Sequence, residues 1–402
     1  MDTDVLIAGA GPAGSAAAIH LARLGWRVTV VDRAAFPRDK PCSEYLSPEA
    51  VRLLDEFSLV EPLESAGAVR LGGTTVVGPR GHRLTGLFRH ATPAPWRAEG
   101  LSVPRRLLDA RLVEAARAAG AEVRERTRVE DLLYDRGAVA GAVVRGPDGR
   151  HAPIRARLTL GADGLGSVVA RRLGGVRRAA PRRVALVAHV AGVRDVGPTA
   201  EMHVGEHGYV GINRIGAGLF NVALVVPRAR AAAARGAAPE FFFRQLEGFP
   251  GVRGRVDRTR LARQVLAAGP FSSRAARVSA AGALLLGDAA DFFDPFTGQG
   301  ITAALRGARL AAEVADGALG HPGIPSAAAL APYAALRRRA FAGKWAVERL
   351  IGYGMYLPTL FDRAVERLGR SPELAHTLIG VTGDFVPAGR VLDPRFLARM
   401  LL

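Results

Sequence analysis

The sequence predicts an α/β protein in which one domain is built on a parallel β-sheet, a second is built on a mixed β-sheet, and the C-terminal region is helical. Two observations lead to this prediction. Short apolar runs end in glycine-rich stretches at 9–14, 161–167 and 287–300, as is typical of buried parallel strands that lead into helices. Residues alternate in polarity over 184–193 and 219–226, which indicates a second sheet with one face toward a ligand cavity.

The first glycine-rich stretch lies in a βαβ unit. We expect a strand over 5–8, a helix over 13–24 that stops at Gly25, and a second strand over 28–31. The stretch 229–239 is either a helix or a surface excursion. The other elements follow in chain order: a helix over 104–119, strands and a hairpin over 123–144, strands over 158–160 and 283–286, a helix over 301–319, and helices from 332 onward that are broken at Gly343, Pro358 and Pro387.

Both predicted domains are discontinuous, because the chain leaves the first sheet and returns to it. The predicted division is 1–75, 100–180 and 270–335 for a nucleotide-binding domain, 76–99 and 181–269 for a β-sheet substrate domain, and 336–402 for the helical region.

Composition narrows the possible functions. Cys42 is the single cysteine, which excludes an intramolecular disulfide and a cysteine-rich metal site and agrees with a cytoplasmic location. No metal is expected, since Glu201, His203 and His207 do not have a strong metal-ligand spacing. No signal peptide precedes the first strand, and no apolar run reaches the roughly 18 residues of a membrane span.

The formal net charge is +18, and nearly all the basic charge is arginine, since Lys40 and Lys344 are the only lysines. The arginines are scattered and no nucleic-acid motif accompanies them, so no nucleic-acid partner is expected. A peripheral contact with an anionic membrane, or attraction of an anionic substrate, stays open. The oligomeric state is not predicted.

The first three glycines have the spacing of a dinucleotide fingerprint between a strand and a helix. Gly9 allows the tight turn, and Gly11 lets the backbone approach a pyrophosphate. Gly14 lets the helix pack closely against the strand. The context of a strand before and a helix after makes this a credible nucleotide site.

The helix that follows and the second strand complete this half of the site. Pro12 and Ala13 open the helix, whose positive N-terminus would hold the pyrophosphate. Asp32 ends the second strand, with Arg33 beside it, at the spacing of a ribose-binding acid. An acid there disfavours a 2′-phosphate, which favours FAD or NAD over NADP.

The last glycine-rich stretch is expected to meet the same dinucleotide. Asp288 follows Gly287 at a strand end, where a carboxylate can accept a hydrogen bond from a ribose or ribitol hydroxyl. The next helix N-terminus would stabilise negative charge at the N1/O2 edge of a flavin. The cofactor-binding residues expected there are Pro295, Gly298, Gln299, Gly300 and Ile301. Flavoproteins that hold FAD cross one dinucleotide several times in this way, so the three glycine-rich stretches together predict FAD.

Together these motifs resemble flavoproteins with the p-hydroxybenzoate hydroxylase fold, over most of residues 1–310. That group contains aromatic monooxygenases, epoxidases, halogenases and geranylgeranyl reductases. Asp163 and Gly164 resemble its second motif, which is implicated in FAD and NAD(P)H contacts, and Asp288 belongs to a match for the third, which holds the ribitol. Arg105 resembles the family arginine near the flavin. The resemblance implies a Rossmann-like FAD/NAD(P)-binding domain, bound FAD, and NAD(P)H as a transient electron donor.

The stretch 36–48 is similar to one in geranylgeranyl reductases, although Ser43, Glu44 and Tyr45 replace the glycines that follow the cysteine there. Cys42 is a candidate reactive thiol, and Glu44 and Tyr45 are candidate acid or base groups beside the flavin. The three tryptophans lie far apart and Lys40 lacks the context of the halogenase lysine, so halogenation is not expected.

The favoured function is a monooxygenase that uses NAD(P)H and O₂ to hydroxylate an aromatic or polyketide-like hydrophobic substrate through a flavin C4a-hydroperoxide. The alternative is a geranylgeranyl reductase-like enzyme that reduces C=C bonds of a prenyl or other hydrophobic substrate. A flavin-binding protein without turnover is a third hypothesis. In both enzymes the cofactor carries the chemistry, and the substrate would lie between the flavin and the strands within 184–193 and 209–226.

Overall fold

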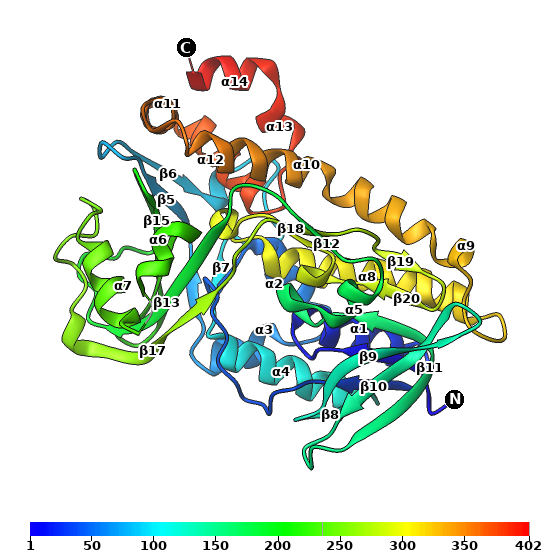
Figure 1. The fold of residues 1–402 in the computed structure, drawn as a ribbon. Coiled ribbons are helices and arrows are strands. Elements are labelled where there is room, and N and C mark those ends of the chain that lie inside the picture. The colour runs from blue at the N-terminus through cyan, green and yellow to red at the C-terminus, as the bar shows by residue number, and fades with distance from the viewer. Residues whose placement is uncertain (235, 402) are drawn as a thin grey trace.

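A parallel β-sheet forms the centre of the part of the molecule that contains the N-terminus (Figure 1). The computed structural model describes residues 1–234 and 236–401. In this sheet β1 lies between β2 and β11, and β8 and β20 extend the parallel part on either side. The strands of the sheet are β1 (Thr3–Ala8), β2 (Val28–Val31), β8 (Glu122–Arg124), β9 (Arg128–Asp135), β10 (Ala138–Arg145), β11 (His151–Gly161), β19 (Ser279–Ala280) and β20 (Ala283–Leu285).

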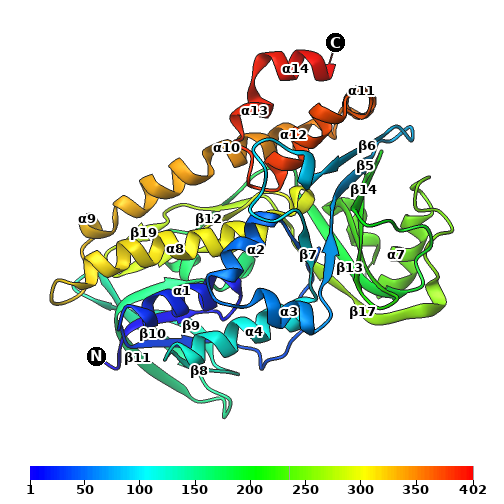
Figure 2. The same ribbon diagram turned by 180° about the vertical axis from the view of Figure 1, so that it is seen from behind.

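Both faces of β1 are buried, which explains its continuous apolar run. Val5 and Ile7 enter a core formed with α1 (Pro12–Arg23), α4 (Arg105–Ala118) and α8 (Gly300–Leu319). Leu6 and Ala8 enter a second core formed with the antiparallel strands β9 and β10 and with α5 (Val168–Arg172). Figure 2 shows α1 between α8 and α4 on the helical side of the sheet.

A seven-stranded mixed sheet forms the second part of the molecule, in the order β17-β13-β16-β15-β14-β5-β6. Only β5 and β14 pair in parallel. Along β13, Ala185 and Val187 face one core while Leu186 and Ala188 face another beneath α7 (Ala238–Leu246), which confirms the predicted alternation. The strands are β5 (Gly73–Val77), β6 (Arg83–Leu87), β13 (Arg183–Ala191), β14 (Ala200–Gly205), β15 (Gly208–Gly216), β16 (Leu219–Pro227) and β17 (Leu261–Ala268).

Two small sheets and several short helices connect these parts. The small sheets are β3-β7-β4 and β12-β18-β21. Their strands are β3 (Tyr45–Leu46), β4 (Val69–Leu71), β7 (Gly100–Ser102), β12 (Val176–Arg178), β18 (Ser273–Ala275) and β21 (Asp291–Phe292). The connecting helices are α2 (Pro48–Asp55), α3 (Val60–Ser65), α6 (Arg228–Ala231) and α9 (Ala327–Leu330).

The predicted stretch 229–239 forms short helical pieces, with α6 at its start and α7 beginning at Ala238. Arg235, inside that stretch, and Leu402, at the chain end, lie outside the described residues. Among the residues that the structure does describe, no helix has the length and apolar character needed to cross a membrane.

The C-terminal helices lie together along one side of the molecule (Figures 1 and 2). They are α10 (Pro332–Gly354), α11 (Pro358–Arg370), α12 (Pro372–Thr382), α13 (Gly389–Leu392) and α14 (Pro394–Leu401). The break expected at Gly343 is wrong, because α10 continues through it. A Cβ atom there would lie 2.7 Å from the Cβ of Ala388, so this glycine permits close packing instead of ending the helix. The breaks at Pro358 and Pro387 are confirmed.

The fold is therefore the predicted α/β class with a mixed second sheet and a helical C-terminal region. Each large sheet takes strands from separate parts of the chain, which is the topology expected of discontinuous domains. The residue boundaries of those domains stay a prediction.

Candidate active site

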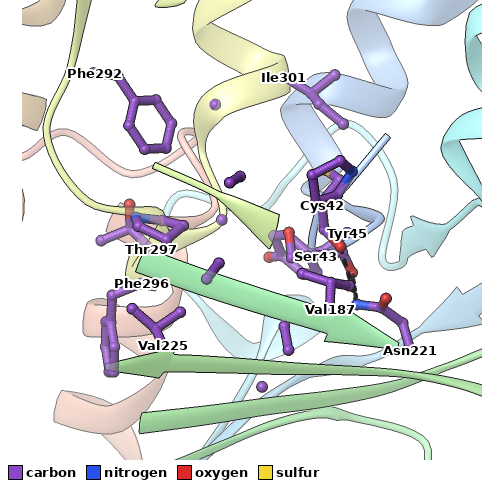
Figure 3. A pocket seen from close by; sticks show the side chains of 18 of the residues that line it. Cys42, Ser43, Tyr45, Val187, Asn221, Val225, Phe292, Phe296, Thr297 and Ile301 are labelled. Carbon is purple, nitrogen blue, oxygen red and sulfur yellow. Dashed lines mark hydrogen bonds between the residues drawn. The ribbon is translucent and has the colours of Figure 1, made fainter. Parts of the chain in front are cut away.

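A cavity of about 220 Å³ lies between the carboxyl ends of the parallel strands and the mixed sheet. In parallel α/β sheets this edge is where ligands bind. Figure 3 shows Cys42, Tyr45 and Asn221 on one side of the cavity and Phe292 and Phe296 on the other. The cavity therefore joins the glycine-rich loops to the second sheet.

Most of the predicted site residues meet in this cavity, although their motifs lie far apart in the sequence. Those that line it are Gly11, Pro12, Ala13, Cys42, Tyr45, Arg105, Gly164, Gly287, Asp288, Pro295, Gly298, Gly300 and Ile301. The predicted residues that do not line it are Gly9, Gly14, Asp32, Arg33, Glu44, Asp163 and Gln299.

The first glycine turn is shaped for close approach of backbone and ligand. Gly9 has a φ of +99°, and a Cβ atom there would lie 2.5 Å from the carbonyl oxygen of Ala162. A Cβ on Gly14 would overlap the carbonyl oxygen of Gly9. Gly11 differs, because its Cβ would project into open space, with Arg38 and Arg105 nitrogens 3.8 and 3.9 Å away. That open space is where a pyrophosphate would fit.

Two helix N-termini point their free N–H groups toward the cavity. Neither α1 nor α8 has a side-chain cap or an acidic residue in its first turn. Uncapped N–H groups and the helix dipole favour an anion or a partial negative charge. The side-chain amide of Gln299, the N-cap residue of α8, donates instead to Asp384 (2.7 Å) and the carbonyl of Val381 (3.3 Å).

Asp32 and Arg33 lie beyond the glycine turn, outside the cavity lining. The buried Asp32 carboxylate accepts hydrogen bonds from the backbone N–H groups of Ala10 and Ala34, each at 2.8 Å. It therefore holds the turn against the end of β2, while a carboxylate oxygen retains a lone pair for a ribose hydroxyl. Arg33 is exposed. The ribose-binding role of Asp32 stays a prediction.

Asp163 belongs to the second glycine-rich stretch and lies outside the cavity lining. One of its carboxylate oxygens accepts a hydrogen bond from the N–H of Val168 at 2.6 Å. The other oxygen is buried and has no hydrogen-bond partner among the described residues. Burial raises the pKa of Asp163. An unpaired buried oxygen beside the Gly9 turn fits a site completed by a bound ligand or water.

A cluster of cations faces the pyrophosphate space. The Arg105 guanidinium binds Asp109 through two hydrogen bonds of 2.8 Å, and Arg38 contacts the same carboxylate at 3.1 Å. Burial opposes the charge on Arg105, but Asp109 and the adjacent Cys42 side chain hold its pKa above the ordinary value. One carboxylate for two guanidiniums leaves positive charge available for an anion.

Lys40 and Asp288 add a second pair of charges on the cavity wall. Lys40 makes no ion pair or hydrogen bond within the described parts of the chain. Burial and the neighbouring Arg105 lower the pKa of the Lys40 ammonium. Burial raises the pKa of Asp288, although Lys40 and Arg105 oppose this. These groups suit the ribitol and phosphates of FAD better than an apolar substrate.

The loop before α8 is fixed by the second sheet. Asp294 accepts hydrogen bonds from Arg183 of β13 (2.8 Å) and from the Tyr209 hydroxyl of β15 (2.6 Å). Gly298, which follows in this loop, has a φ of +68° and lies against the ring of Tyr45. A Cβ on Gly298 would lie 2.6 Å from Tyr45 Cδ1, so glycine is required there.

The three predicted catalytic residues separate into two groups. Cys42 and Tyr45 line the cavity, as expected. Glu44, in contrast, is only 1 % exposed and turns away, because its φ of +57° directs the backbone through a left-handed conformation. Its carboxylate binds His189 (2.8 Å) and the N–H of Arg105 (3.2 Å). The Glu44 carboxylate therefore faces these partners and not the cavity, and the acid or base role predicted for it stays a prediction.

Burial raises the pKa of the Tyr45 phenol above its ordinary value. The hydroxyl therefore stays protonated at neutral pH and acts as a hydrogen-bond or proton donor, not as a base. Asn221 of β16 positions the preceding loop, since its amide donates to the carbonyls of Cys42 (3.2 Å) and Ser43 (3.0 Å).

Part of the cavity wall was not predicted from the sequence. The unpredicted lining includes Thr74 and Val76 of β5 and Ile351, Leu378, Ile379 and Thr382 of the C-terminal helices. Apolar periodicity marks such helix faces as buried, but it does not say what they cover. The sequence signal for this wall is an apolar helix face to which no partner is assigned.

Asp384, beside the N-terminus of α8, makes a pH-dependent contribution to stability. Burial raises its pKa to about 6, despite the opposing charges of Lys344 and Arg306. A carboxyl with a raised folded-state pKa costs stability once it ionises. Asp384→Asn is therefore expected to raise the free energy of unfolding by about 1–3 kcal/mol above roughly pH 7, and progressively less toward roughly pH 4.

Urea unfolding at several pH values measures this difference. Asn keeps an acceptor for the Gln299 amide and tolerates the φ of +66° at this position. The exposed Asp55→Asn serves as the control. A gain for Asp384→Asn that is equal at acidic and neutral pH would contradict the assignment.

Two glycine turns, two uncapped helix N-termini and a cluster of cationic side chains surround one cavity. These are the features of a dinucleotide-binding flavoprotein. The family comparison agrees, because the family model described as "FAD binding domain" matches residues 2–316. The chain belongs to this FAD-binding family and is an FAD-dependent oxidoreductase.

Individual relatives extend over most of the chain. Digeranylgeranylglycerophospholipid reductase 2 of Methanothermobacter thermautotrophicus is 32% identical over 382 residues, which cover 93% of this chain and 92% of the relative. Menaquinone reductase of Mycolicibacterium smegmatis is 32% identical over 330 residues, or 77% and 76% of the two chains. The structure of the myxobacterial chondrochloren halogenase CndH matches with a TM-score of 0.80 at 24% identity, over 88% of this chain and 83% of that one, which shows a shared fold.

Proposed function

We propose that this flavoenzyme reduces carbon–carbon double bonds in a long apolar substrate. The observation that carries the proposal is the pairing of an apolar cavity with a proton donor, Tyr45, at its cofactor side. The two relatives described above are both named as reductases, and the name of one of them includes the geranylgeranyl group. NAD(P)H is the proposed electron donor. This choice departs from the monooxygenase that the sequence alone favours.

The substrate half of the cavity is apolar on three sides. Val187 and Val225 line it from the mixed sheet, Phe292 from β21 and Phe296 from the loop before α8, and Leu378 from α12. Such a lining binds an extended hydrocarbon by the hydrophobic effect and keeps water from the reacting carbons.

The cavity wall carries few carboxylates, and each is either paired or on the cofactor side. In the described lining they are Glu201 and Asp288. Glu201 is paired with His203 (2.7 Å) and Arg255 (2.8 Å), and Asp288 lies with the cofactor-side glycines. Hydroxylation of a phenol benefits from a base that removes the phenolic proton. Neither carboxylate of the described lining is an unpaired base on the substrate side, and the unpaired Lys40 lies with the cofactor-side charges, which favours reduction.

Reduction of a double bond needs a hydride for one carbon and a proton for the other. Bound FAD in its reduced form supplies the hydride. The protonated Oη of Tyr45 supplies the proton, while Gly298 and Asn221 hold the ring and its loop in place. Proton exchange with solvent then restores the phenol. The C=C bond becomes a CH–CH bond, and the electron pair comes from NAD(P)H.

Aromatic hydroxylation remains the second candidate. Phe271, Phe292 and Phe296 all line the cavity, and aromatic side chains pack well against an aromatic substrate. This function needs O₂ as co-substrate, whereas reduction does not.

An anaerobic experiment separates the two candidates. The FAD-loaded protein is reduced with NADH or NADPH without O₂ and mixed with geranylgeraniol. We expect the flavin absorption to return and mass spectrometry to show a product with added hydrogen. A flavin that stays reduced with the alkene, but consumes O₂ and hydroxylates an aromatic ligand, would contradict the proposal. A protein without turnover under either condition would be a flavin-binding protein only.

A further inference from the structure

An exposed apolar surface lies where α10 ends and α11 begins. We call residues 350–360 the apolar corner. Five of the nine strongly exposed large apolar side chains in the described chain belong to it. They are Leu350 (38 %), Tyr353 (47 %), Tyr356 (54 %), Leu357 (56 %) and Leu360 (41 %). Contiguous exposed apolar groups of this kind mark interaction surfaces.

Arginines surround the apolar corner, and acids are missing from it. Residues 349–361 include no Asp or Glu, and the exposed Arg349 and Arg363 flank the corner. The Tyr353 hydroxyl donates to the carbonyl of Ala180 (3.0 Å), which brings the arginine-rich segment 177–182 alongside. The exposed arginines at 177, 178, 349 and 363 make no ion pair with a carboxylate of the described residues.

Arg80 approaches the corner from the side of β5 and β6. Its guanidinium donates to the hydroxyl of Thr359 at 3.3 Å. The nearby Asp362 is only 2 % exposed and is occupied by His82 (2.6 Å) and the N–H of Arg80 (2.9 Å). The surface around the corner therefore presents apolar and positive groups, and the neighbouring Asp362 carboxylate is buried.

The apolar corner is connected to the active-site cavity. Ile351 lines the cavity, directly next to the exposed Leu350. The carbonyl of Gly352 accepts a hydrogen bond from Arg183 (3.2 Å), whose guanidinium also lies 5.1 Å from the ring centroid of Tyr356. The same Arg183 binds Asp294 in the loop before α8. The corner thus packs on the loop that closes the cavity.

We propose that the apolar corner docks the protein on an anionic lipid bilayer, with its tyrosines and leucines in the headgroup region. Tyrosine is favoured at the membrane–water interface, and arginines attract anionic lipid. Stable peripheral binding needs two such signals together, and the corner carries both. A second copy of the chain is a poorer partner, because two arginine-ringed surfaces would repel each other. Delivery of a lipid substrate to the cavity through this corner rests in addition on the proposed reductase function.

Vesicle sedimentation with the full FAD-loaded protein tests the docking directly. The probes are vesicles of phosphatidylcholine alone and of equal parts phosphatidylcholine and phosphatidylglycerol. We expect binding to the anionic vesicles that weakens with added salt. The triple variant Tyr356→Ser, Leu357→Ser, Leu360→Ser is expected to bind about tenfold more weakly or worse. Leu24→Ser with Trp96→Ser, which changes exposed apolar residues elsewhere, is the matched control.

The flavin content and melting temperature of each variant show whether it has folded. Equal binding of the triple variant and the wild type would overturn the proposal, as would equal binding to neutral and anionic vesicles. A dimer that the triple variant loses in sedimentation velocity, together with no vesicle binding, would overturn it in favour of a self-interface. Vesicle binding needs no turnover, so a failure of the proposed reductase function leaves this result readable on its own.

Discussion

Gly11→Ala is expected to leave the apoprotein folded and as stable as the wild type, yet to weaken FAD binding at least about tenfold. The reason is the position of the added methyl group. It meets no atom closer than 3.8 Å in the protein itself, and the φ of −77° at Gly11 suits any residue. The methyl group would instead occupy the space where the pyrophosphate approaches the N-terminus of α1. Fluorescence titration of the apoprotein with FAD measures the loss.

Two other alanine substitutions make this prediction specific. Gly14→Ala would place its Cβ against the carbonyl oxygen of Gly9, so it should lower both FAD affinity and stability. Gly317 lies inside α8, and a Cβ atom added there would have no atom within 4 Å. Gly317→Ala should keep full FAD binding and melt slightly higher, since alanine is a better helix former than glycine. If Gly11→Ala bound FAD as tightly as Gly317→Ala does, the pyrophosphate would not lie at this turn.

The parts of the fold that the sequence predicts correctly are those with a local signal. The βαβ unit at β1, α1 and β2 has apolar runs and glycines within a few residues of one another, so its bounds were predicted closely. The predicted helix break at Gly343 is wrong because a glycine in a helical pattern has two possible structural reasons. It can end the helix, or it can allow a neighbouring segment to pack closely. Only the position of Ala388, 45 residues further on in the chain (343 against 388), decides between them.

The candidate site shows the same limit. The sequence identifies which loops carry glycines, and the structure brings those loops to one cavity. A sequence motif does not specify the direction in which a side chain points within a loop. Glu44 and Tyr45 are neighbours, but the left-handed backbone at Glu44 sends its carboxylate to His189 while Tyr45 faces the cavity. The arginine cluster that includes Arg38, and the wall formed by α12, likewise depend on contacts between distant segments.

Tyr45→Phe is expected to reduce the rate of alkene reduction about 10²-fold while FAD binding stays unchanged. A positioned general acid contributes a factor of this order. The substitution removes only the Oη atom and keeps the ring that packs against Gly298. The two half-reactions should separate the effect. Flavin reduction by NAD(P)H needs no proton from Tyr45 and should keep its rate, whereas reoxidation of the flavin by the alkene should slow.

Cys42→Ala is the matched variant, because Cys42 is another protic side chain from the same loop that lines the cavity. If Tyr45 is the donor, Cys42→Ala retains most of its reoxidation rate and the solvent isotope effect of the wild type, and Tyr45→Phe loses both. The opposite pattern would make the thiol the proton donor. A structural role for the Tyr45 hydroxyl would slow both half-reactions and lower the melting temperature, because loss of Oη would then loosen the loop on which both half-reactions depend. The half-reaction that slows therefore decides whether the buried phenol donates a proton or only supports the loop.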